Sequence, residues 1–375
     1  MKIKMLDLKG QYDKIKQEID AAIQCVIDET AFIQGAEVKE FETNLAGYLG
    51  IRHVISCANG TDALQISMMA LGLKPGDEVI VPSFTYVATA EVIALLGLTP
   101  VLVDVDPATF NIKIEDIEPS ITGRTKAIVP VHLFGQCAPM EAIMDIAKKY
   151  SLYVIEDNAQ ALGAKYSFKN GSERFAGTIG DIGCTSFFPS KNLGCFGDGG
   201  AIFTNDDKLA EKLRMVANHG QLVKYHHDIV GCNSRLDTIQ AAVLNVKLSK
   251  LDGYACSRGE AAAVYRELLK DIPELILPAE SSFSTHVYHQ FTIRCKQRDS
   301  LKAFLAGKGI PTMIYYPLPL HKQRAFSDIS VIKSGLDVSE RLCEEVLSLP
   351  IHTELTREEQ EYIASNIRYF FINCK

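Results

Sequence analysis

The sequence predicts an α/β protein with a large, mostly parallel sheet sandwiched by helices and a smaller C-terminal α/β domain. Three observations predict this fold. The chain has 375 residues, of which 47% are hydrophobic, and this length favours one large domain plus a smaller one. Short β-branched runs recur roughly every 20 to 30 residues, with helical patterns between them. From Ser234 to Leu269 the pattern then becomes long and helical.

The predicted strands of the large domain are short apolar runs. In chain order they read HVISC, DEVIVP, PVLVDVD, KAIVPVHL, LYVIED, IGCTSFF and GAIFTND. Strands that alternate with helices are typical of a parallel sheet with helices on its faces. The last runs follow one another too closely for a crossover helix, which predicts one hairpin-like or antiparallel edge.

The helical stretch from Ser234 to Leu269 is predicted to connect the two domains. After it, we predict a strand over THVYHQFTIRC, a helix over SLKAFLAGKGI and a strand over PTMIYYPL. We therefore expect a large domain of residues 1–245 and a small C-terminal domain of residues 246–375.

Charge and hydropathy exclude two classes of partner. The chain has 39 basic and 46 acidic residues, a net charge of -7, and so no basic field that would attract nucleic acid or an anionic membrane. The first residues, MKIKMLDLKGQYDKIK, lack the apolar core of a signal peptide, and runs such as VIALLGL are too short to span a bilayer. We expect a cytoplasmic protein that binds neither nucleic acid nor membrane.

Cysteine and histidine spacing gives no metal-binding pattern. The 10 cysteines contain no C-x-x-C pair, so we expect reduced and mostly buried thiols. His226 and His227 are adjacent and poorly suited to share one tetrahedral site, while His286 and His289 of the segment HVYH have no nearby acid or thiol. We predict no metal.

Chemically useful residues follow several predicted strands, at the ends where open α/β sheets bind ligands. After HVISCA, Asn59 and Gly60 turn the chain. Thr61 and Asp62 then open a helix whose free amides suit a phosphate. A capped helix start without a ligand is the alternative interpretation.

Two further strand ends carry an acid and an amine. Asp157 ends LYVIED, and Gln160 follows it; a solvated acid that begins a helix is the alternative here. Ser186 lies in the run IGCTSFF, and Lys191 follows shortly after it. Together with the helix start, these residues supply an amine nucleophile, a phosphate seat and a lone acid. Pyridoxal phosphate uses all three, because its aldehyde bonds a lysine and its ring nitrogen stays protonated beside a carboxylate.

The loop around Lys191 reads SFFPSKNLGCFGDGGAIF. We expect Phe187, Phe188 and Pro189 to form a dry wall that fixes the lysine, with the glycines serving the geometry of the turn. A partly desolvated lysine is useful, since the neutral amine is the reactive form. The segments GTIGDIG and GCFGDGG lack the G-x-G-x-x-G spacing of dinucleotide sites, and no G-x-x-x-x-G-K-[ST] phosphate loop occurs.

These residues belong to motifs that run along nearly the whole chain. The chain resembles the DegT-type nucleotide-sugar aminotransferases, a family of fold type I pyridoxal phosphate enzymes, in the motifs FIQGAEVKEFE, ANGTDALQI, PSFTYVATAEVI, VIEDNAQALGA, TSFFPSKNLGCFGDGGAIFTND, NSRLDTIQAA and LSLPIH. The resemblance implies Lys191 as the Schiff-base lysine, Asp157 on the pyridine nitrogen, Gln160 near the ring hydroxyl and Tyr86 stacked on the ring face. It implies the backbone amides of Thr61 and Asp62, with Ser186, as holders of the phosphate.

The resemblance also implies a homodimer with shared active sites and glutamate as the amino donor. In this family the segment matching GCNSRLD crosses from the partner subunit, which would bring Asn233 to the phosphate. Some related proteins are dehydratases with histidine in place of the lysine, and Lys191 argues against that class. A protein that binds the cofactor for regulation without catalysis is a further alternative.

The substrate is suggested by a narrower resemblance, to enzymes that aminate UDP-2-acetamido-2-deoxy-3-oxo-D-glucuronate for surface polysaccharides such as lipopolysaccharide. It rests on DLKGQY, HGQ, KYHH and YYPLPLHKQ, besides the loop around Lys191. Arg235 is the candidate for the sugar carboxylate, with Tyr315, Tyr316 and His227 as neighbours; an interface salt bridge is the alternative for Arg235. Other 3-keto or 4-keto nucleotide sugars are alternative acceptors, since fold does not select among them.

Overall fold

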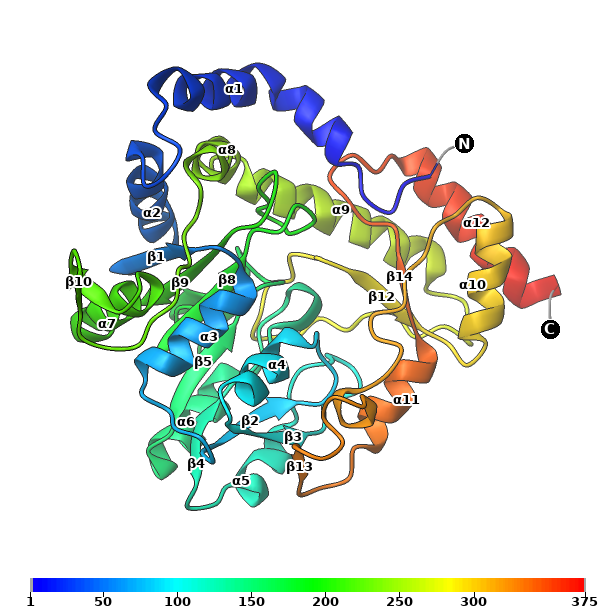
Figure 1. Ribbon diagram of the computed structural model, residues 1–375. Coiled ribbons are helices and arrows are strands. Elements are labelled where there is room, and N and C mark those ends of the chain that lie inside the picture. Colours follow the sequence, from blue (N-terminus) through cyan, green and yellow to red (C-terminus); the bar gives the residue numbers. More distant parts are fainter. Residues whose placement is uncertain (1–2, 374–375) are drawn as a thin grey trace.

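The computed structural model describes residues 3–373, and an eight-stranded sheet forms its centre (Figure 1). The strand order is β1-β9-β8-β5-β4-β2-β3-β13. The strands are β1 (His53–Cys57), β2 (Glu78–Pro82), β3 (Thr99–Val103), β4 (Thr125–Ile128), β5 (Tyr153–Asp157), β8 (Ile182–Ser186), β9 (Gly200–Thr204) and β13 (Val331–Ile332). Strand β9 runs antiparallel to β1 and β8, and the other neighbours are parallel. The predicted mostly parallel sheet is confirmed, with its antiparallel strand one position in from the edge.

Side chains alternate between the two faces of this sheet, as the period of a strand requires. One face presents Ile55, Val79, Val81, Leu102, Ile155 and Ile202. The other presents Val54, Ile80, Val101, Val103, Val154 and Phe203. Both sets are buried, which explains why these strands appear in the sequence as continuous apolar runs.

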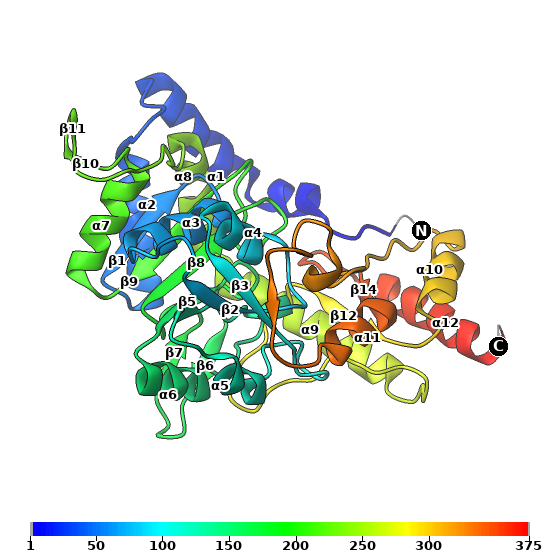
Figure 2. The same cartoon turned by 60° about the horizontal axis from the view of Figure 1, so that its bottom comes forward.

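Helices cover both faces. The first face packs against α3 (Gly60–Ala70), α4 (Ala88–Leu95) and α7 (Asp207–Ala217). The second packs against α2 (Ala36–Leu49), α5 (Ile117–Ser120), α6 (Met140–Tyr150) and α8 (Thr238–Leu248). Figure 2 shows α3 and α4 on one side of the sheet and α5 and α6 on the other. Because helices cover both faces of the sheet, a ligand can reach it only at the ends of the strands.

The C-terminal part builds its own core on a two-stranded sheet of β12 (Phe291–Arg294) and β14 (Val346–Leu349). Around it lie α9 (Leu251–Leu269), α10 (Arg298–Gly307), α11 (Asp337–Glu345) and α12 (Arg357–Asn373). Tyr265, Phe291 and Leu301 are fully buried in this core. The division of the chain at residue 246 stays a prediction; that position lies within α8, whose Leu248 packs in a core with Phe41.

Two local predictions differ from the structure. The helical stretch 234–269 is two helices, α8 and α9, separated at Ser249 and Lys250. The strand predicted over PTMIYYPL is wrong: Met313 makes a single antiparallel bridge to Ser348, and the chain then leaves the sheet. In THVYHQFTIRC, only β12 is a regular strand.

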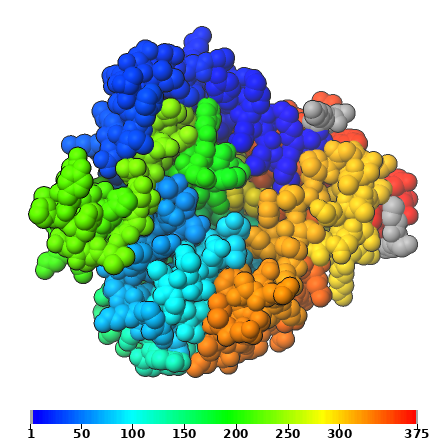
Figure 3. Space-filling model, viewed as in Figure 1, coloured from blue at the N-terminus to red at the C-terminus, as the bar shows by residue number. Residues whose placement is uncertain are grey.

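The N-terminal helix α1 (Leu8–Glu29) ties the two parts together. Ile15 and Ile19 pack on Val243 of α8, and Lys14 forms an ion pair of 2.5 Å with Glu354. Figure 3 shows this helix in dark blue across the top of the molecule, reaching the yellow and red C-terminal part. The short remaining elements are η1 (Ile114–Asp116), η2 (Leu133–Gly135), η3 (Leu320–Lys322), β6 (Lys165–Ser167), β7 (Glu173–Phe175), β10 (Gln221–Val223) and β11 (His226–His227).

Candidate active site

A cavity of about 780 Å³ opens at the carboxyl ends of the central strands, between the sheet and the C-terminal part. This is where open α/β sheets bind ligands, and the volume suits a small molecule. Predicted site residues in its wall are Thr61, Asp62, Tyr86, Asp157, Gln160, Ser186, Lys191, Tyr315 and Tyr316. The cavity therefore combines residues of the large sheet domain with residues of the C-terminal part.

Lys191 lies in the loop between β8 and β9. Its backbone N–H donates to the carbonyl of Phe188 at 2.8 Å, which makes a tight turn under the side chain. Burial lowers the pKa of Lys191 from 10.5 to about 8, and the nearby Asp157 carboxylate opposes part of this shift. A lysine with such a pKa is partly neutral near neutral pH, as a nucleophilic amine must be.

The wall expected from the aromatic residues before Lys191 is only partly present. Phe188 lines the cavity, but its side chain is 52% exposed in the single chain. Phe187 is fully buried elsewhere, with its ring 5.2 Å from that of Phe41 in the core. The two neighbours point to opposite sides because the chain is still extended at the end of β8. Phe187 therefore anchors the loop and does not line the site.

The glycines of this loop serve close packing. A Cβ on Gly194 would lie 2.5 Å from the carbonyl oxygen of Pro189, so only glycine fits there. The carbonyl of Gly194 in turn accepts a hydrogen bond from the buried amine of Lys247 on α8. The loop that carries Lys191 is thus folded back on itself and fixed from a helix.

The start of α3 forms the other end of the cavity. Asn59 caps the helix, and its Oδ1 accepts a hydrogen bond of 2.8 Å from the N–H of Asp62. That amide, which the sequence assigned to a phosphate, is therefore engaged in the cap. A Cβ on Gly60 would lie 2.8 Å from Cβ of Ser186, so Gly60 keeps the helix start next to this serine. The result is a helix N-terminus with a hydroxyl beside it, an arrangement that suits a phosphate.

Asp157 is the last residue of β5 and is 6% exposed. Its Oδ2 accepts a hydrogen bond of 2.7 Å from Thr89 Oγ1, and its Oδ1 accepts one of 3.1 Å from the N–H of Ala159. These bonds fix the carboxylate in the cavity wall. Thr89 is a residue that the sequence reasoning missed; only its place one helical turn after Tyr86, in the first turn of α4, hints at it.

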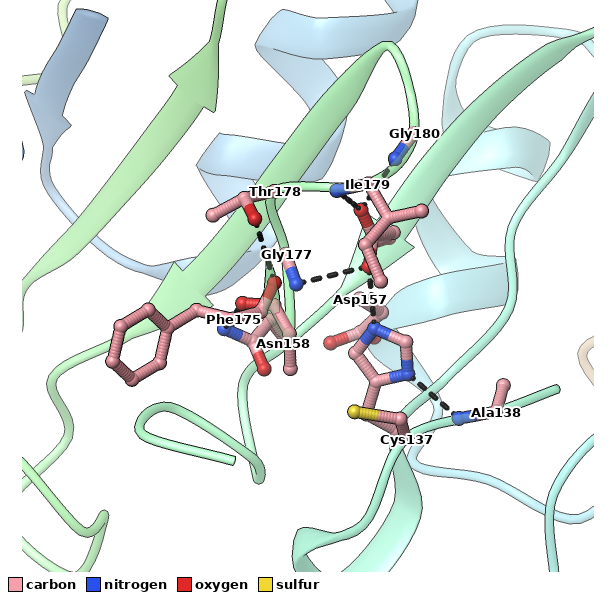
Figure 4. A network of polar contacts seen from close by, with 12 residues as sticks. Cys137, Ala138, Asp157, Asn158, Phe175, Gly177, Thr178, Ile179 and Gly180 are labelled. Atoms are coloured by element: carbon pink, nitrogen blue, oxygen red, sulfur yellow. Dashed lines mark hydrogen bonds and ion pairs between the residues drawn. The ribbon is translucent and has the colours of Figure 1, made fainter. Parts of the chain in front are cut away.

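The residue before Asp157 faces the opposite way and secures the strand end. The Glu156 carboxylate is fully buried and accepts hydrogen bonds of 2.6 to 2.9 Å from His132 Nε2 and from the N–H groups of Gly177, Ile179 and Gly180 (Figure 4). Nδ1 of His132 accepts from the N–H of Ala138, so Nε2 carries the hydrogen. Burial alone would raise the pKa of Glu156, but the hydrogen bonds from His132 and the amides lower it by more. The pKa therefore lies below its ordinary value, and Glu156 stays ionised.

An aromatic wall stands near the Asp157 side of the cavity. Gln160 Oε1 accepts a hydrogen bond of 2.9 Å from the N–H of Phe134, and Gln160 Nε2 donates to Tyr316 Oη at 3.0 Å. The rings of Tyr86 and Tyr316 are 6.3 Å apart, and Tyr86 is 57% exposed. Its ring is thus available to a flat ligand.

His289 also lines the cavity, and the sequence reasoning considered it only as a metal ligand. It is 6% exposed, and its Nδ1 is buried without a hydrogen-bond partner. The same is true of Oγ1 of Thr85, a second cavity residue. Unpaired buried polar atoms are uncommon, and a ligand bound in the cavity would supply partners for these two.

Three predicted residues lie outside this cavity in the single chain. Asn233 pairs with Asn218 in an isolated bridge, and Arg235 lines a separate pocket beside Glu42. His227 is exposed on β11, with Nδ1 2.8 Å from the carbonyl of His219. The expected neighbourhood of Arg235 and His227 with Tyr315 and Tyr316 is therefore not present within one subunit.

Neither a metal-binding cluster nor a disulfide occurs among the described residues. Residues 3–373 contain no group of three or more His, Cys, Asp or Glu side chains placed to bind a metal ion. The cysteines in that range are free thiols, most of them buried. Among the helices of the same range, none combines the length and apolar character that a membrane span needs.

The residues of the cavity fit pyridoxal phosphate. A lysine with a lowered pKa, a fixed carboxylate, a helix N-terminus and unpaired polar atoms line one space. The groups match an aldehyde, a protonated ring nitrogen and a phosphate.

Comparison with known proteins agrees with this fit. Residues 13–368 match the model of the DegT/DnrJ/EryC1/StrS aminotransferase family. The chain is 48% identical over 99% of both chains to a Geobacillus stearothermophilus protein named pleiotropic regulatory protein. It is 50% identical to the UDP-2-acetamido-2-deoxy-3-oxo-D-glucuronate aminotransferase of Pseudomonas aeruginosa, over 94% of this chain and 96% of that one. An Acidithiobacillus ferrooxidans UDP-N-acetyl-3-dehydro-alpha-D-glucosamine 3-aminotransferase is 46% identical, over 98% and 97%.

Solved structures agree as well. A DegT DnrJ EryC1 StrS aminotransferase from Brucella abortus is 46% identical, with a TM-score of 0.94 over 98% of this chain and 99% of that one. NtdA from Bacillus subtilis, solved with its bound cofactor PMP, is 33% identical, with a TM-score of 0.88 over 96% and 82%. The chain therefore belongs to the DegT/DnrJ/EryC1/StrS aminotransferase family and is a pyridoxal phosphate-dependent sugar aminotransferase.

Proposed function

We propose that this chain is a nucleotide-sugar aminotransferase that moves an amino group from glutamate to UDP-2-acetamido-2-deoxy-3-oxo-D-glucuronate, for surface polysaccharides such as lipopolysaccharide. The observation that carries the proposal is Lys191, an amine of lowered pKa in the same cavity as the Asp157 carboxylate. The acceptor is supported by the P. aeruginosa relative at 50% identity. Other 3-keto and 4-keto nucleotide sugars are the alternatives that the experiment separates.

Four side chains of this chain would have separate roles in the reaction. Pyridoxal phosphate, when bound, supplies an aldehyde that carries the amino group and a ring that takes up electrons. Asp157 would hold its protonated ring nitrogen, because Thr89 and the amide of Ala159 fix the carboxylate oxygens. Nζ of Lys191 would accept a proton from the α-carbon of glutamate and donate a proton on the side of the cofactor. With the keto sugar, Lys191 would move the proton in the opposite direction, from the side of the cofactor to the sugar carbon. Tyr86 would cover the ring face, and Gln160 would lie near the ring hydroxyl.

The phosphate would lie at the start of α3. The free amides of Gly60 and Thr61 and the hydroxyl of Ser186 would hold it there, supported by the positive end of the helix dipole. The Asp62 carboxylate accepts a hydrogen bond of 2.6 Å from Ser234 Oγ, which turns its charge toward the segment that includes Asn233.

The proposal includes a homodimer with shared sites. Tyr225 is 79% exposed and Val230 is 85% exposed, although both side chains are large and apolar. An association surface over this segment would bury them and bring Asn233, Arg235 and His227 of the partner subunit to the cavity. Arg235 would then bind the sugar carboxylate with its planar guanidinium group, beside Tyr315 and Tyr316.

A regulatory role without catalysis is the second candidate, because a relative at 48% identity is named as a regulatory protein. The two candidates differ in turnover. A regulator keeps its cofactor unchanged when glutamate is added, whereas an aminotransferase converts it and needs a keto sugar to restore it.

The experiment follows the absorbance of the reconstituted enzyme. Glutamate should bleach the bound pyridoxal phosphate, and a panel of UDP- and dTDP-linked 3-keto and 4-keto sugars is then tested for return of colour. We expect return with the 3-keto glucuronate, and at lower rates with the other sugars. Return only with a 4-keto sugar would refute the acceptor, and no bleaching by glutamate or other amino acids would refute the transfer.

A matched pair of lysine variants completes this test. Lys191→Ala should abolish turnover, while Lys148→Ala, which removes an exposed lysine of α6, should leave it unchanged. Turnover that survives in Lys191→Ala would remove Lys191 from the mechanism.

A further inference from the structure

The hydroxyl of Ser234 joins the start of α3 to the segment that follows α7. Its oxygen accepts a hydrogen bond of 2.9 Å from the N–H of Ala58, and it donates one of 2.6 Å to Oδ2 of Asp62. A backbone N–H can only donate, so the single hydrogen of the hydroxyl goes to the carboxylate. Ser234 is therefore a committed donor to Asp62.

Ser234 is itself fixed in place. It is 1% exposed, and its N–H donates to the carbonyl of Ala217 at 3.0 Å, at the end of α7. The N–H of Cys232 donates to the carbonyl of Val216 at 2.8 Å, so this segment runs along the end of the same helix. The Asp62 carboxylate is thus bound to a donor that the surrounding backbone holds still.

Asp62 occupies a position where a carboxylate could interfere with an anion. It is the third residue of α3, and an acidic side chain there usually turns back to the helix N-terminus, where N–H groups are unpaired and the helix dipole is positive. The N–H groups of Gly60 and Thr61 at this end are the ones that would hold the phosphate. Asp62 lines the cavity with them, whereas Ser234 lines a separate pocket. The bond to Ser234 therefore directs Oδ2 toward a group outside the cavity wall.

We propose that Ser234 is a positioning residue for the phosphate end of the cavity: its hydroxyl holds the Asp62 carboxylate off the N–H groups at the start of α3, which stay free for an anion. Without this donor, the carboxylate would compete with the phosphate for the same positive helix end, and the two negative charges would repel each other. This inference rests on the proposed function for the place of the phosphate. It concerns binding alone, and its test does not require turnover.

The test compares two forms of the cofactor on the cofactor-free full chain. Pyridoxal phosphate and pyridoxal, which lacks the phosphate, are titrated and followed by absorbance. Ser234→Ala should raise the Kd of pyridoxal phosphate about tenfold, the size of an interaction between two charges near a protein surface, and should change the Kd of pyridoxal by less than about twofold. An unchanged Kd of pyridoxal phosphate, or an equal rise for both compounds, would overturn the inference.

A second pair of variants tests whether the carboxylate is the cause. In the background Asp62→Asn, which carries no charge, Ser234→Ala should change the Kd of pyridoxal phosphate by less than about twofold. A loss that persists in this background would mean that Ser234 acts through another group, such as its neighbour Asn233, and would also overturn the inference. Should Ser234→Ala not fold, as checked by circular dichroism, Ser234→Cys keeps the shape of the side chain with a weak donor and gives the same comparison.

The matched control is Ser56→Ala. Oγ of Ser56 also donates to a carboxylate, at 2.9 Å to Oε1 of Glu42, and Ser56 is 9% exposed. Glu42 lies on α2, and its other carboxylate oxygen forms an ion pair of 3.0 Å with Arg214. The ratio of the two Kd values should therefore stay as in the native chain. The same shift in Ser56→Ala as in Ser234→Ala would mean that loss of any buried hydroxyl has this effect, against the inference.

The same titrations separate this inference from the proposed function. A native chain that binds pyridoxal phosphate but is not bleached by glutamate would refute the transfer, and the comparison of Kd values would still decide the role of Ser234. A native chain that binds pyridoxal as tightly as pyridoxal phosphate would overturn the inference directly, because no phosphate would then be recognised.

Discussion

At the residue scale, the pKa of Lys191 decides at which pH the chain captures its cofactor. Burial lowers this pKa to about 8, so the reactive neutral amine forms above about pH 8, earlier than for an ordinary lysine. The rate at which pyridoxal phosphate binds to cofactor-free protein should rise about tenfold between about pH 7 and pH 9 and then level off. Stopped-flow absorbance measures this rate. A rate that still rises steeply near pH 10 would mean that Lys191 titrates near its ordinary value of 10.5.

The carboxylate of Asp157 makes a second prediction at this scale. Thr89→Val removes the 2.7 Å hydrogen bond to Asp157 Oδ2 and should cost about 1 to 3 kcal/mol in the free energy of unfolding. It should also weaken cofactor binding, because the carboxylate that would hold the ring nitrogen is less fixed. Urea unfolding and cofactor titration measure both effects.

Thr85→Val is the matched control for this change. Oγ1 of Thr85 is buried in the same cavity without a hydrogen-bond partner, so in the cofactor-free protein its removal should leave the free energy of unfolding unchanged or raise it. Equal losses in the two variants would show that the hydrogen bond to Asp157 is unimportant.

Several residues of the site could be predicted from the sequence, and others could not, for a physical reason. Lys191, Asp157 and Thr61 lie at or shortly after the ends of predicted strands, so their place at one sheet edge follows from topology. Thr89 and His289 reach the cavity from a helix and from the C-terminal part, and their place there depends on distances between elements far apart in the sequence. No local pattern encodes such distances.

At the element scale, the loop between β8 and β9 depends on glycine. Gly194→Ala would place a Cβ 2.5 Å from the Pro189 carbonyl, a backbone atom that cannot turn away. We expect the loop to move by a fraction of an ångström or more, with a loss of activity on the order of 100-fold, since catalysis is that sensitive to position. Steady-state kinetics and thermal unfolding measure the two effects.

Gly47→Ala in the last turn of α2 provides the opposite case. No atom lies within 4 Å of the added Cβ, so this variant should gain about 0.5 to 1 kcal/mol from helix propensity and keep full activity. If Gly194→Ala behaves like Gly47→Ala, the close packing of the Lys191 loop has no functional role.

The elements themselves were predictable where burial and propensity agree. The apolar runs became β1 to β5, β8 and β9, since both faces of the sheet are covered. The run PTMIYYPL has the same composition, but Tyr315 and Tyr316 leave the bridge at Met313 to line the cavity. Aromatic residues placed for a ligand and aromatic residues placed for a sheet give the same pattern in the sequence.

At the scale of the whole molecule, the arrangement of the two parts follows from contacts that no single segment specifies. The cavity needs the sheet for Asp157 and Lys191 and the C-terminal part for His289 and Tyr316. The sequence predicts both parts, but their relative position depends on contacts such as the packing of α1 on α8 and the ion pair of Lys14 with Glu354. The proposed dimer extends this logic, because neither Asn233 nor Arg235 lines the cavity of its own chain.

A shared site makes a quantitative prediction for mixed subunits. Lys191→Ala and Asn233→Asp should each be nearly inactive as pure proteins, the second because a carboxylate would lie beside the phosphate. When the two are unfolded together and refolded in equal amounts, half of the dimers are mixed. In a mixed dimer one site combines the native Lys191 of one subunit with the native Asn233 of the other. The mixture should therefore regain about a quarter of the native activity.

The control mixture is Lys191→Ala with Asp157→Asn. Both residues line the cavity of the same chain, so every site in a mixed dimer carries one of the two changes and activity should stay near that of the pure variants. Equal recovery of activity in the two mixtures would mean that the activity does not come from native sites formed between subunits. Absence of recovery in the first mixture, with mixed dimers demonstrated by native mass spectrometry, would mean that each subunit completes its own site and that Asn233 acts, if at all, within its own chain.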